Sequence, residues 1–139
     1  MTYRQWDIIA DLYIPILLLC SLWVLLRTKH KPDFKKRIAT LAISILTVYS
    51  LMFIDNRLRL WAYVDLDYST HTALALTLVV FLSNNKRCTL IATSSIMMYF
   101  LLMIYQQYHS ALDILSTAIA LLPLLYFIMK KLKVQRINL

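Results

Sequence analysis

The sequence predicts an all-α integral membrane protein, built as a bundle of about five transmembrane helices. Of its 139 residues, 60% are hydrophobic, whereas soluble domains are typically ~45–50% apolar. The mean hydropathy is +0.64. The 15 Lys and Arg residues gather in short clusters between apolar runs, which is typical of membrane topology rather than of nucleic-acid binding. We therefore expect a single membrane domain over residues 1–139 and no nucleic-acid partner.

Five apolar runs define the expected helices. They are Ile8–Leu26, Ile38–Ile54, Tyr68–Leu82, Cys88–Tyr105 and Ala111–Met129. Because about 20 residues cross a hydrocarbon core of ~30 Å, most of these runs are long enough. The third is short, so it either takes in residues from 64–67 or begins below the membrane surface. The sequence contains no glycine, so Ala, Ser and Thr have to provide the close helix contacts that glycine usually allows.

The charged connections between the apolar runs predict the orientation. The basic clusters are residues 27–37, Lys86 with Arg87, and residues 130–136. With five crossings these clusters share one side of the membrane, which the positive-inside rule makes cytoplasmic. The N-terminus then lies outside and the C-terminus in the cytoplasm, and the loops 55–67 and 105–110 face outward. From the small size we expect a bacterial inner membrane with the functional site on the periplasmic side.

Two polar clusters stand out within a core of residues 55–118. Asp67-Tyr68-Ser69-Thr70-His71-Thr72-Ala73 opens the third apolar run, and Tyr105-Gln106-Gln107-Tyr108-His109-Ser110-Ala111-Leu112-Asp113 opens the fifth. Each cluster places a histidine at an expected helix start on the outward face. The spacing of His109 and Asp113 predicts that they share one helical face within hydrogen-bonding distance. Ionisable groups at membrane depth are energetically costly and therefore indicate a functional site.

Two histidines and one aspartate at an outward surface suit phosphoryl chemistry. A neutral imidazole can attack phosphorus when a carboxylate fixes its tautomer and supports the cation that forms, and Asp113 is the candidate support for His109. His71 is the candidate general acid and base, because an imidazole works near its unperturbed pKa. The N–H groups at the start of the third helix, helped by the Ser69 hydroxyl, are expected to bind the phosphoryl group. We expect neither a metal nor another cofactor.

These residues also resemble a known family. Ser69-Thr70-His71-Thr72-Ala73 resembles the Ser-Gly-His-Thr segment of the type 2 phosphatidic acid phosphatase superfamily, and His109-x-x-x-Asp113 resembles its last motif. The Asp-Tyr pair before Ser69 and the Tyr before His109 are more similar to the sphingomyelin synthase branch. The resemblance implies that His109 is the nucleophile, that Asp113 supports it and that His71 handles the leaving group.

The sequence departs from the family pattern at several phosphate-binding positions. Thr70 stands where the family has glycine, and the Lys-x6-Arg-Pro motif is absent. Arg57 and Arg59 are the nearest substitutes, although a solvated loop or a contact with lipid headgroups is an equally good interpretation of these two arginines. No cation occurs among residues 104–108, and one helix of the family's usual six is missing. The expected phosphate-binding residues are therefore Ser69, Thr70, Arg57 and Arg59.

Three functions follow from these patterns. The first is a membrane lipid phosphatase or phospho-headgroup transferase that acts on a phospholipid or prenyl phosphate at the outer face through a phosphohistidine intermediate. The alternative, motivated by the missing glycine and cations, is a catalytically inactive membrane subunit or lipid-binding module of the same fold. A small transporter or proton relay is less favoured, because the ionisable groups cluster at one face rather than line a path. A homo-oligomer or larger membrane complex would complete a bundle of only five short helices.

Overall fold

The chain folds into α-helices throughout. The computed structural model describes residues 3–83 and 85–132. Its elements are α1 (Tyr3–Arg27), α2 (Phe34–Leu58), the short 3₁₀ helix η1 (Ala62–Val64), α3 (Thr70–Leu82), α4 (Lys86–Tyr105) and α5 (Ala111–Lys131). Each of the five apolar runs forms a helix, and no strand occurs in these ranges. The predicted all-α fold is confirmed at this level.

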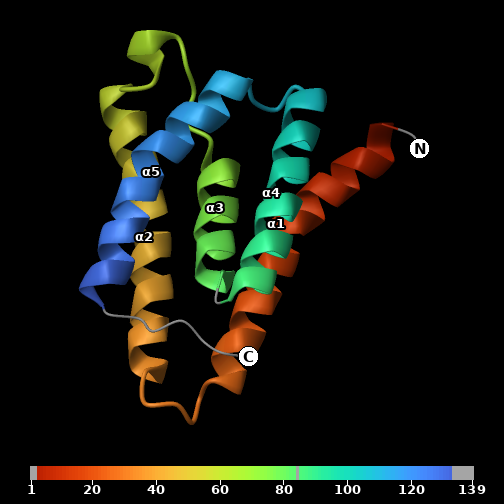
Figure 1. Ribbon diagram of the computed structural model, residues 1–139. Helices are drawn as coiled ribbons and strands as arrows, with labels where there is room; N and C mark the ends of the chain where they lie inside the picture. The colour runs from red at the N-terminus through yellow and green to blue at the C-terminus, as the bar shows by residue number, and fades with distance from the viewer. Residues whose placement is uncertain (1–2, 84, 133–139) are drawn as a thin grey trace.

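Four of the helices are long and apolar enough to cross a membrane. These are α1, α2, α4 and α5, with 20 to 25 residues each. Helix α3 has 13 residues and is therefore only about 20 Å long. The segment before it does not extend the helix, because Ser69 caps α3 with an extended backbone at φ −88° and ψ 96°. Figure 1 shows that α3 begins well below the upper ends of α2 and α4, and its depth relative to a membrane surface stays a prediction.

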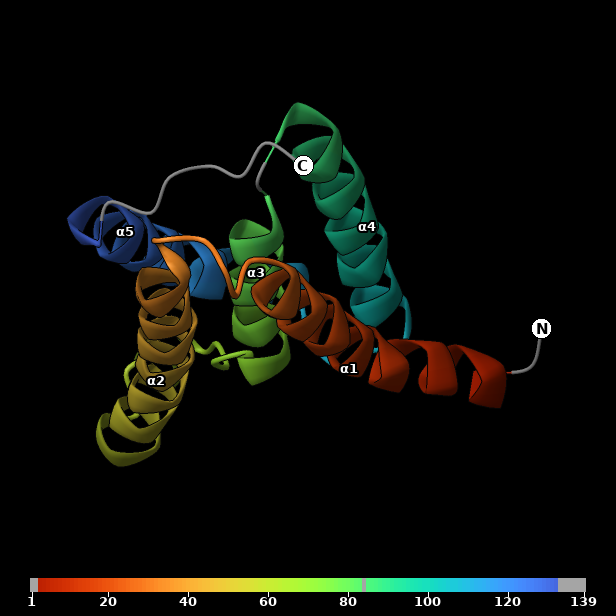
Figure 2. The same cartoon turned by 90° about the horizontal axis from the view of Figure 1, so that it is seen from below.

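Helix α3 forms the centre of the bundle. It packs against α1, α2, α4 and α5, which surround it in two perpendicular views (Figures 1 and 2). Every residue of α3 is described, and His71 is its only exposed one. Its buried small residues are Thr72, Ala73, Ala75 and Thr77. They allow neighbouring helices to approach closely, in the way expected for a chain without glycine.

The outer faces of the surrounding helices are apolar. Leu19, Leu46, Leu90 and Ile119, one from each of these helices, are 64 to 70% exposed. Extensive exposed apolar surface marks an interaction site in a soluble protein, whereas lipid is a suitable solvent for it. The distribution of apolar side chains therefore agrees with a membrane-embedded bundle.

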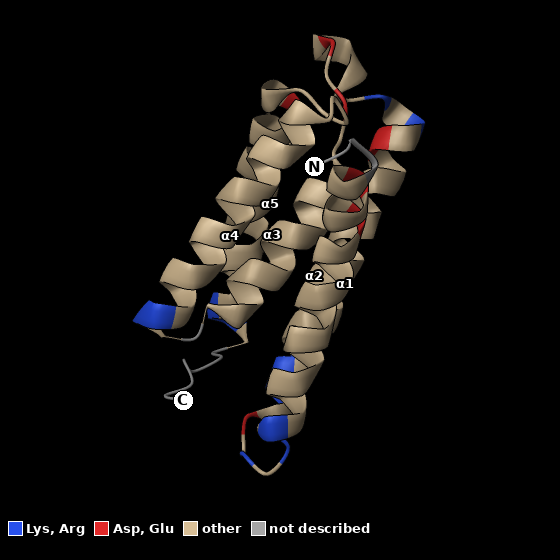
Figure 3. Cartoon of the chain, turned by 90° about the vertical axis from the view of Figure 1, so that its right-hand side faces the viewer, with Lys and Arg blue, Asp and Glu red and all other residues tan. Residues whose placement is uncertain are grey.

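Opposite charges gather at opposite ends of the bundle (Figure 3). We call the acidic end the one formed by the starts of α1, α3 and α5 and the ends of α2 and α4. Six of the seven acidic residues lie there, together with Arg57 and Arg59. The basic end contains the α1–α2 turn, the start of α4 and the end of α5, which carry the basic clusters. Both histidine segments therefore lie at the acidic end, as the order of the helices predicted.

Candidate functional site

Asp113 joins the segment before α3 to the start of α5. Its Oδ1 accepts a hydrogen bond from the Asp67 N–H at 2.8 Å, and its Oδ2 accepts one from the Ser110 N–H at 2.8 Å. The Ser110 Oγ accepts a bond from the Asp113 N–H in return, at 3.1 Å, which completes a capping box at the start of α5. Because Asp67 leads into α3 and Ser110 follows His109, these bonds bring the two histidine segments together.

His109 lies outside α5 rather than on it. Ser110 is the N-cap and has an extended backbone with ψ 160°, so His109 precedes the first turn. The expected i, i+4 geometry on a helical face therefore does not form. Among the described residues, His109 makes no hydrogen bond to Asp113, whose two oxygens already accept backbone N–H groups. The carboxylate still acts on the imidazole electrostatically.

The environment of His109 favours the neutral imidazole. Burial of the half-buried ring lowers its pKa below the ordinary value, and the nearby His71 lowers it further, while the charges of Asp113 and Asp67 oppose the change. Desolvation disfavours the charged form of any histidine, so His109 is neutral at pH 7. The hydrogen bond from the Asp67 N–H to Asp113 and the electrostatic effect of His71 on His109 together indicate that the two histidines belong to one site.

Ser69 holds the start of α3 in place from inside the bundle. Its side chain is fully buried; the Oγ accepts a hydrogen bond from the Thr72 N–H at 3.2 Å and donates one to the Thr72 Oγ1 at 2.8 Å. The Ser69 N–H donates to the Thr117 Oγ1 of α5 at 3.1 Å. The hydroxyl is thus occupied by internal bonds. The first N–H groups of α3, on the half-buried Thr70 and on His71, precede any helical partner and remain available to an anion.

Arg57 and Arg59 lie at the acidic end but away from the histidines. Both are exposed at the end of α2, and the Arg57 guanidinium lies 5.3 Å from the centre of the Phe53 ring. Arg59 terminates α2 in a left-handed conformation at φ 52°. The surface pocket that the two arginines line with Tyr63 includes neither histidine. The structure therefore does not bring these predicted phosphate-binding residues to the histidine pair.

A cavity of about 40 Å³ lies beside His71. It is lined by Ala10, Asp11, His71, Tyr99, Met103 and Tyr108. A space of this size holds a water molecule when several polar groups surround it. The Tyr99 hydroxyl is buried and has no hydrogen-bond partner within the described ranges. The charge of Asp11 acts on it electrostatically. Sequence reasoning missed Tyr99, because a tyrosine inside an apolar run is expected to pack, as this one also does by stacking on Tyr13 at 4.2 Å.

Asp7 connects α1 to the loop between α4 and α5. Its Oδ1 accepts a hydrogen bond from the Gln106 Nε2 at 2.6 Å and a longer one from the Tyr108 hydroxyl at 3.3 Å. Tyr108 also lines the cavity beside His71, so these bonds hold part of its wall. The two partners lie about a hundred residues from Asp7 in the sequence, and no local pattern predicts such a contact.

Comparisons with models of protein families, with curated proteins and with solved structures found no match. The family resemblance described above therefore rests on the two short segments 67–73 and 105–113.

Proposed function

We propose that this protein is a membrane enzyme that transfers or hydrolyses a phosphate-containing lipid headgroup through a phosphohistidine intermediate on His109. One observation carries the proposal. Two histidines from separate segments lie near each other at one end of the bundle, and burial keeps one of them neutral. A neutral imidazole retains the lone pair that a nucleophile needs.

The proposed reaction has two steps. In the first, the His109 lone pair attacks phosphorus, the bond from phosphorus to the lipid oxygen breaks, and protonated His71 gives its proton to the departing alkoxide. In the second, neutral His71 takes a proton from water or from a lipid hydroxyl, whose oxygen attacks phosphorus as the bond to His109 breaks. The cavity of about 40 Å³ beside His71 offers a position for such a water molecule.

Asp113 supports this chemistry without a hydrogen bond to His109. Its charge acts on the imidazole and so stabilises the positive charge that develops on His109 during attack. Its hydrogen bonds to the Asp67 and Ser110 N–H groups hold the loop that carries His109. The aspartate is thus proposed to act both on the charge and on the position of the nucleophile.

The charges around the histidines favour a particular class of substrate. Asp11 lines the cavity with His71 and Asp67 acts electrostatically on His109, while Asp7 accepts a bond from Tyr108, which lines the same cavity. Arg57 and Arg59 line a separate pocket. Such surroundings repel a doubly charged phosphate monoester but attract an amine attached to a phosphodiester. Tyrosine rings also attract cationic headgroups, and Tyr108 lines the cavity. We therefore propose a phospholipid with an amine-bearing headgroup, rather than a prenyl phosphate, as the substrate.

The proposed orientation has the N-terminus outside and the C-terminus in the cytoplasm. The basic clusters gather at one end (Figure 3), and the positive-inside rule assigns that end to the cytoplasm. The histidine pair then faces the opposite side, which is the periplasm if the membrane is a bacterial inner membrane. The substrate would accordingly be a lipid of the outer leaflet.

The test is turnover by the purified full chain in lipid nanodiscs. Phosphatidylethanolamine, phosphatidylcholine, phosphatidic acid and a prenyl phosphate would be supplied separately, each with and without a diacylglycerol acceptor whose acyl chains differ from those of the donor, and products measured by mass spectrometry. We expect His109→Ala to abolish turnover and His71→Ala to reduce it by about 10²–10⁴-fold, the usual contribution of a general acid or base. His30→Ala is the matched control, because His30 is exposed in the α1–α2 turn at the basic end. Full turnover by folded His109→Ala would contradict the mechanism.

A second candidate is the catalytically inactive subunit or lipid-binding module. Two observations favour it, because they leave few groups to bind phosphate. Ser69 and Asp113 already form internal hydrogen bonds, and Arg57 and Arg59 line a separate pocket. It predicts that folded protein yields no product from any lipid in the panel. It also predicts that His71→Ala changes association with a second copy or another membrane protein rather than lipid processing.

A further inference from the structure

A second and much larger cavity lies at the basic end. Its volume is about 680 Å³, within the ~300–1,000 Å³ typical of sites for small ligands. Residues from α2, α3, α4 and α5 line it. Helices α4 and α5 each pack on α3, and Figure 1 shows them diverging from the loop that joins them towards the basic end. The cavity occupies the space opened by this divergence.

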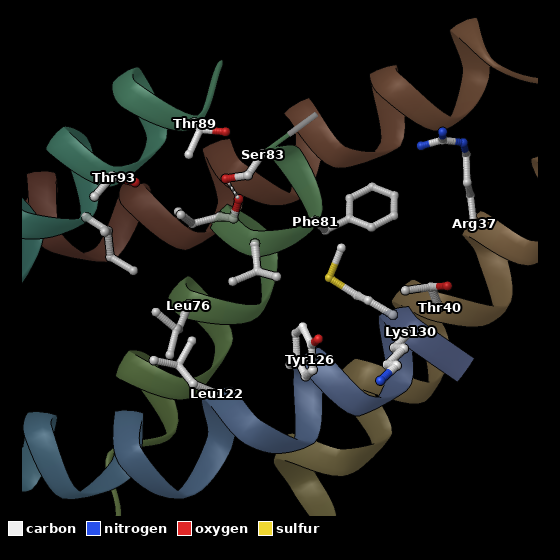
Figure 4. Close-up of a pocket in the computed structure, with 14 residues that line it drawn as sticks. Arg37, Thr40, Leu76, Phe81, Ser83, Thr89, Thr93, Leu122, Tyr126 and Lys130 are labelled. Atoms are coloured by element: carbon white, nitrogen blue, oxygen red, sulfur yellow. Dashed lines mark hydrogen bonds between the residues drawn. The ribbon is translucent and has the colours of Figure 1, made fainter. Parts of the chain in front are cut away.

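The walls of this cavity carry apolar side chains in one part and basic side chains in another, and the hydroxyl groups of Ser83, Thr89 and Thr93 line the side away from the basic part. Leu76 of α3 and Leu122 of α5 lie together in one part, and Ile96 of α4 also lines the cavity (Figure 4). Arg37 of α2 lies in the other part near Phe81, and Lys130 of α5 lies there beside Tyr126 and Thr40. The lining therefore matches a molecule with an apolar chain and a polar head.

The polar part of the lining carries only positive charge. Arg37 is 3% exposed although it carries a guanidinium, Lys130 is exposed, and none of the described residues that line the cavity is acidic. The one acidic residue of the basic end, Asp33, forms an ion pair with Lys36 at 3.1 Å and also acts electrostatically on Arg37, so the lysines and arginines of this end outnumber it. A guanidinium presents a fixed set of donors that fits phosphate oxygens. The basic part is thus complementary to a phosphate group.

We propose that this cavity binds one anionic phospholipid of the cytoplasmic leaflet. Its phosphate would lie between Arg37 and Lys130, and an acyl chain would follow Leu76, Ile96 and Leu122. Basic pockets between transmembrane helices on the cytoplasmic side bind anionic headgroups in this manner. A second copy of the chain fits this cavity less well, because it would bring a second basic end against the first. The site is separate from the histidine pair, and the proposal is independent of the proposed catalytic function.

The test measures retention of lipid by the full chain with native mass spectrometry. The probes are dioleoyl phosphatidylglycerol and dioleoyl phosphatidylcholine, which share acyl chains and differ in charge. We expect the wild-type protein to retain one phosphatidylglycerol in preference, and Lys130→Gln to weaken that retention about fivefold, the effect of one cation beside an anionic lipid. Lys131→Gln is the matched control, because Lys131 lies 5.8 Å from the Phe127 ring centre and does not line the cavity. We expect it to retain lipid like the wild type.

Two further variants separate binding from folding. Arg37 is buried, so Arg37→Gln is compared with its neighbour Lys36→Gln for both lipid retention and thermal stability. Leu122→Trp fills the apolar part without changing charge, and we expect it to reduce retention of phosphatidylglycerol. Equal retention of the two lipids, or equal effects of Lys130→Gln and Lys131→Gln, would overturn the proposal. The proposal would also be overturned if the protein formed a lipid-free dimer that Leu122→Trp dissociates, because a second copy of the chain would then occupy the cavity.

Discussion

The two ends of the bundle are built in contrasting ways. At the acidic end, hydrogen bonds connect segments that are distant in sequence: Asp67 to Asp113, Ser69 to Thr117, and Asp7 to Gln106. The cavity beside His71 is about 40 Å³, and the separate surface pocket at Arg57 and Arg59 is about 350 Å³. At the basic end, α4 and α5 diverge and leave about 680 Å³. One end therefore fixes a few polar groups in place, whereas the other provides volume.

We propose that this contrast reflects a division of tasks between the two ends. Reacting groups need to be held within a fraction of an ångström, which requires supporting hydrogen bonds around them. A lipid chain needs apolar volume and tolerates variation in position, because dispersion and apolar contact are not directional. The acidic end, where hydrogen bonds connect the segments, is accordingly the better candidate for chemistry. The basic end, where α4 and α5 diverge, is the better candidate for binding lipid. The variants below test each part of that comparison.

The largest effect on stability is expected from Asp113→Asn. The amide keeps one acceptor oxygen but turns an N–H₂ group towards a backbone N–H that needs an acceptor, and it loses the charge. Because hydrogen bonds to charged groups contribute ~1.5–3 kcal/mol, we expect the free energy of unfolding to fall by about 2 kcal/mol. Thermal unfolding in detergent, followed by circular dichroism, measures it. Asp65→Asn is the control, since Asp65 is exposed and its left-handed backbone at φ 54° suits asparagine. If Asp113→Asn leaves stability unchanged, the carboxylate does not stabilise the fold, and its electrostatic effect on His109 is the role that remains.

A smaller loss is expected from Thr117→Val. Threonine and valine have nearly the same shape, so the change removes only the hydroxyl that accepts the Ser69 N–H. Leaving that N–H buried without an acceptor should cost about 1 kcal/mol. The matched control is Thr47→Val, because Thr47 is half-buried and its hydroxyl donates to the Ile43 carbonyl of its own helix, so its loss leaves no backbone N–H without an acceptor. If both variants unfold at the same temperature, the bond between α3 and α5 does not stabilise the acidic end.

The helices and the grouping of the histidine segments could be predicted from the sequence. Apolar runs separated by charged clusters determine where helices begin and end, and the start of α3 differs by only two residues from the expected Tyr68. The difference arises because Ser69 prefers to cap the helix rather than extend it. Counting the crossings also predicted that His71 and His109 lie at the same end. These features depend on local composition and on chain order.

The detailed geometry of the site could not be predicted, because it depends on which partner each polar group finds. The spacing of His109 and Asp113 indicates a hydrogen bond only if both residues lie on one helix, and the cap at Ser110 places His109 before it. The hydroxyl of Ser69 faces Thr72 instead of the exterior. Likewise, the large cavity results from the angle between α4 and α5, which is set by packing against α3 and by no single residue.

A third effect, on the pH dependence of stability, is expected from His109. Burial lowers its pKa in the folded protein below the ordinary value of 6.5, so the unfolded chain takes up a proton first as the pH falls. The contribution of His109 to stability is therefore fully present above pH 6.5, and it is lost as the pH falls below that value towards the lower pKa of the folded state. His109→Gln should reduce the dependence of the unfolding free energy on pH between pH 7 and pH 5, and His30→Gln, a change at an exposed histidine in the α1–α2 turn, is measured for comparison. A steeper loss of stability in His109→Gln would contradict the assigned sign.

The mildest perturbation tests which end faces the cytoplasm. Cys88 is half-buried at the start of α4, and Cys20 is exposed in the middle of α1, where lipid would cover it. In intact inside-out vesicles, a membrane-impermeant maleimide should label Cys88 and leave Cys20 unreacted. In right-side-out vesicles the maleimide should label a cysteine introduced by Tyr63→Cys and leave Cys88 unreacted, because Tyr63 is 85% exposed at the acidic end. None of these changes should alter thermal stability. Labelling of Cys88 in right-side-out vesicles would show that the bundle has the opposite orientation. The histidine pair would then face the cytoplasmic leaflet, and the large basic cavity would face the outer one.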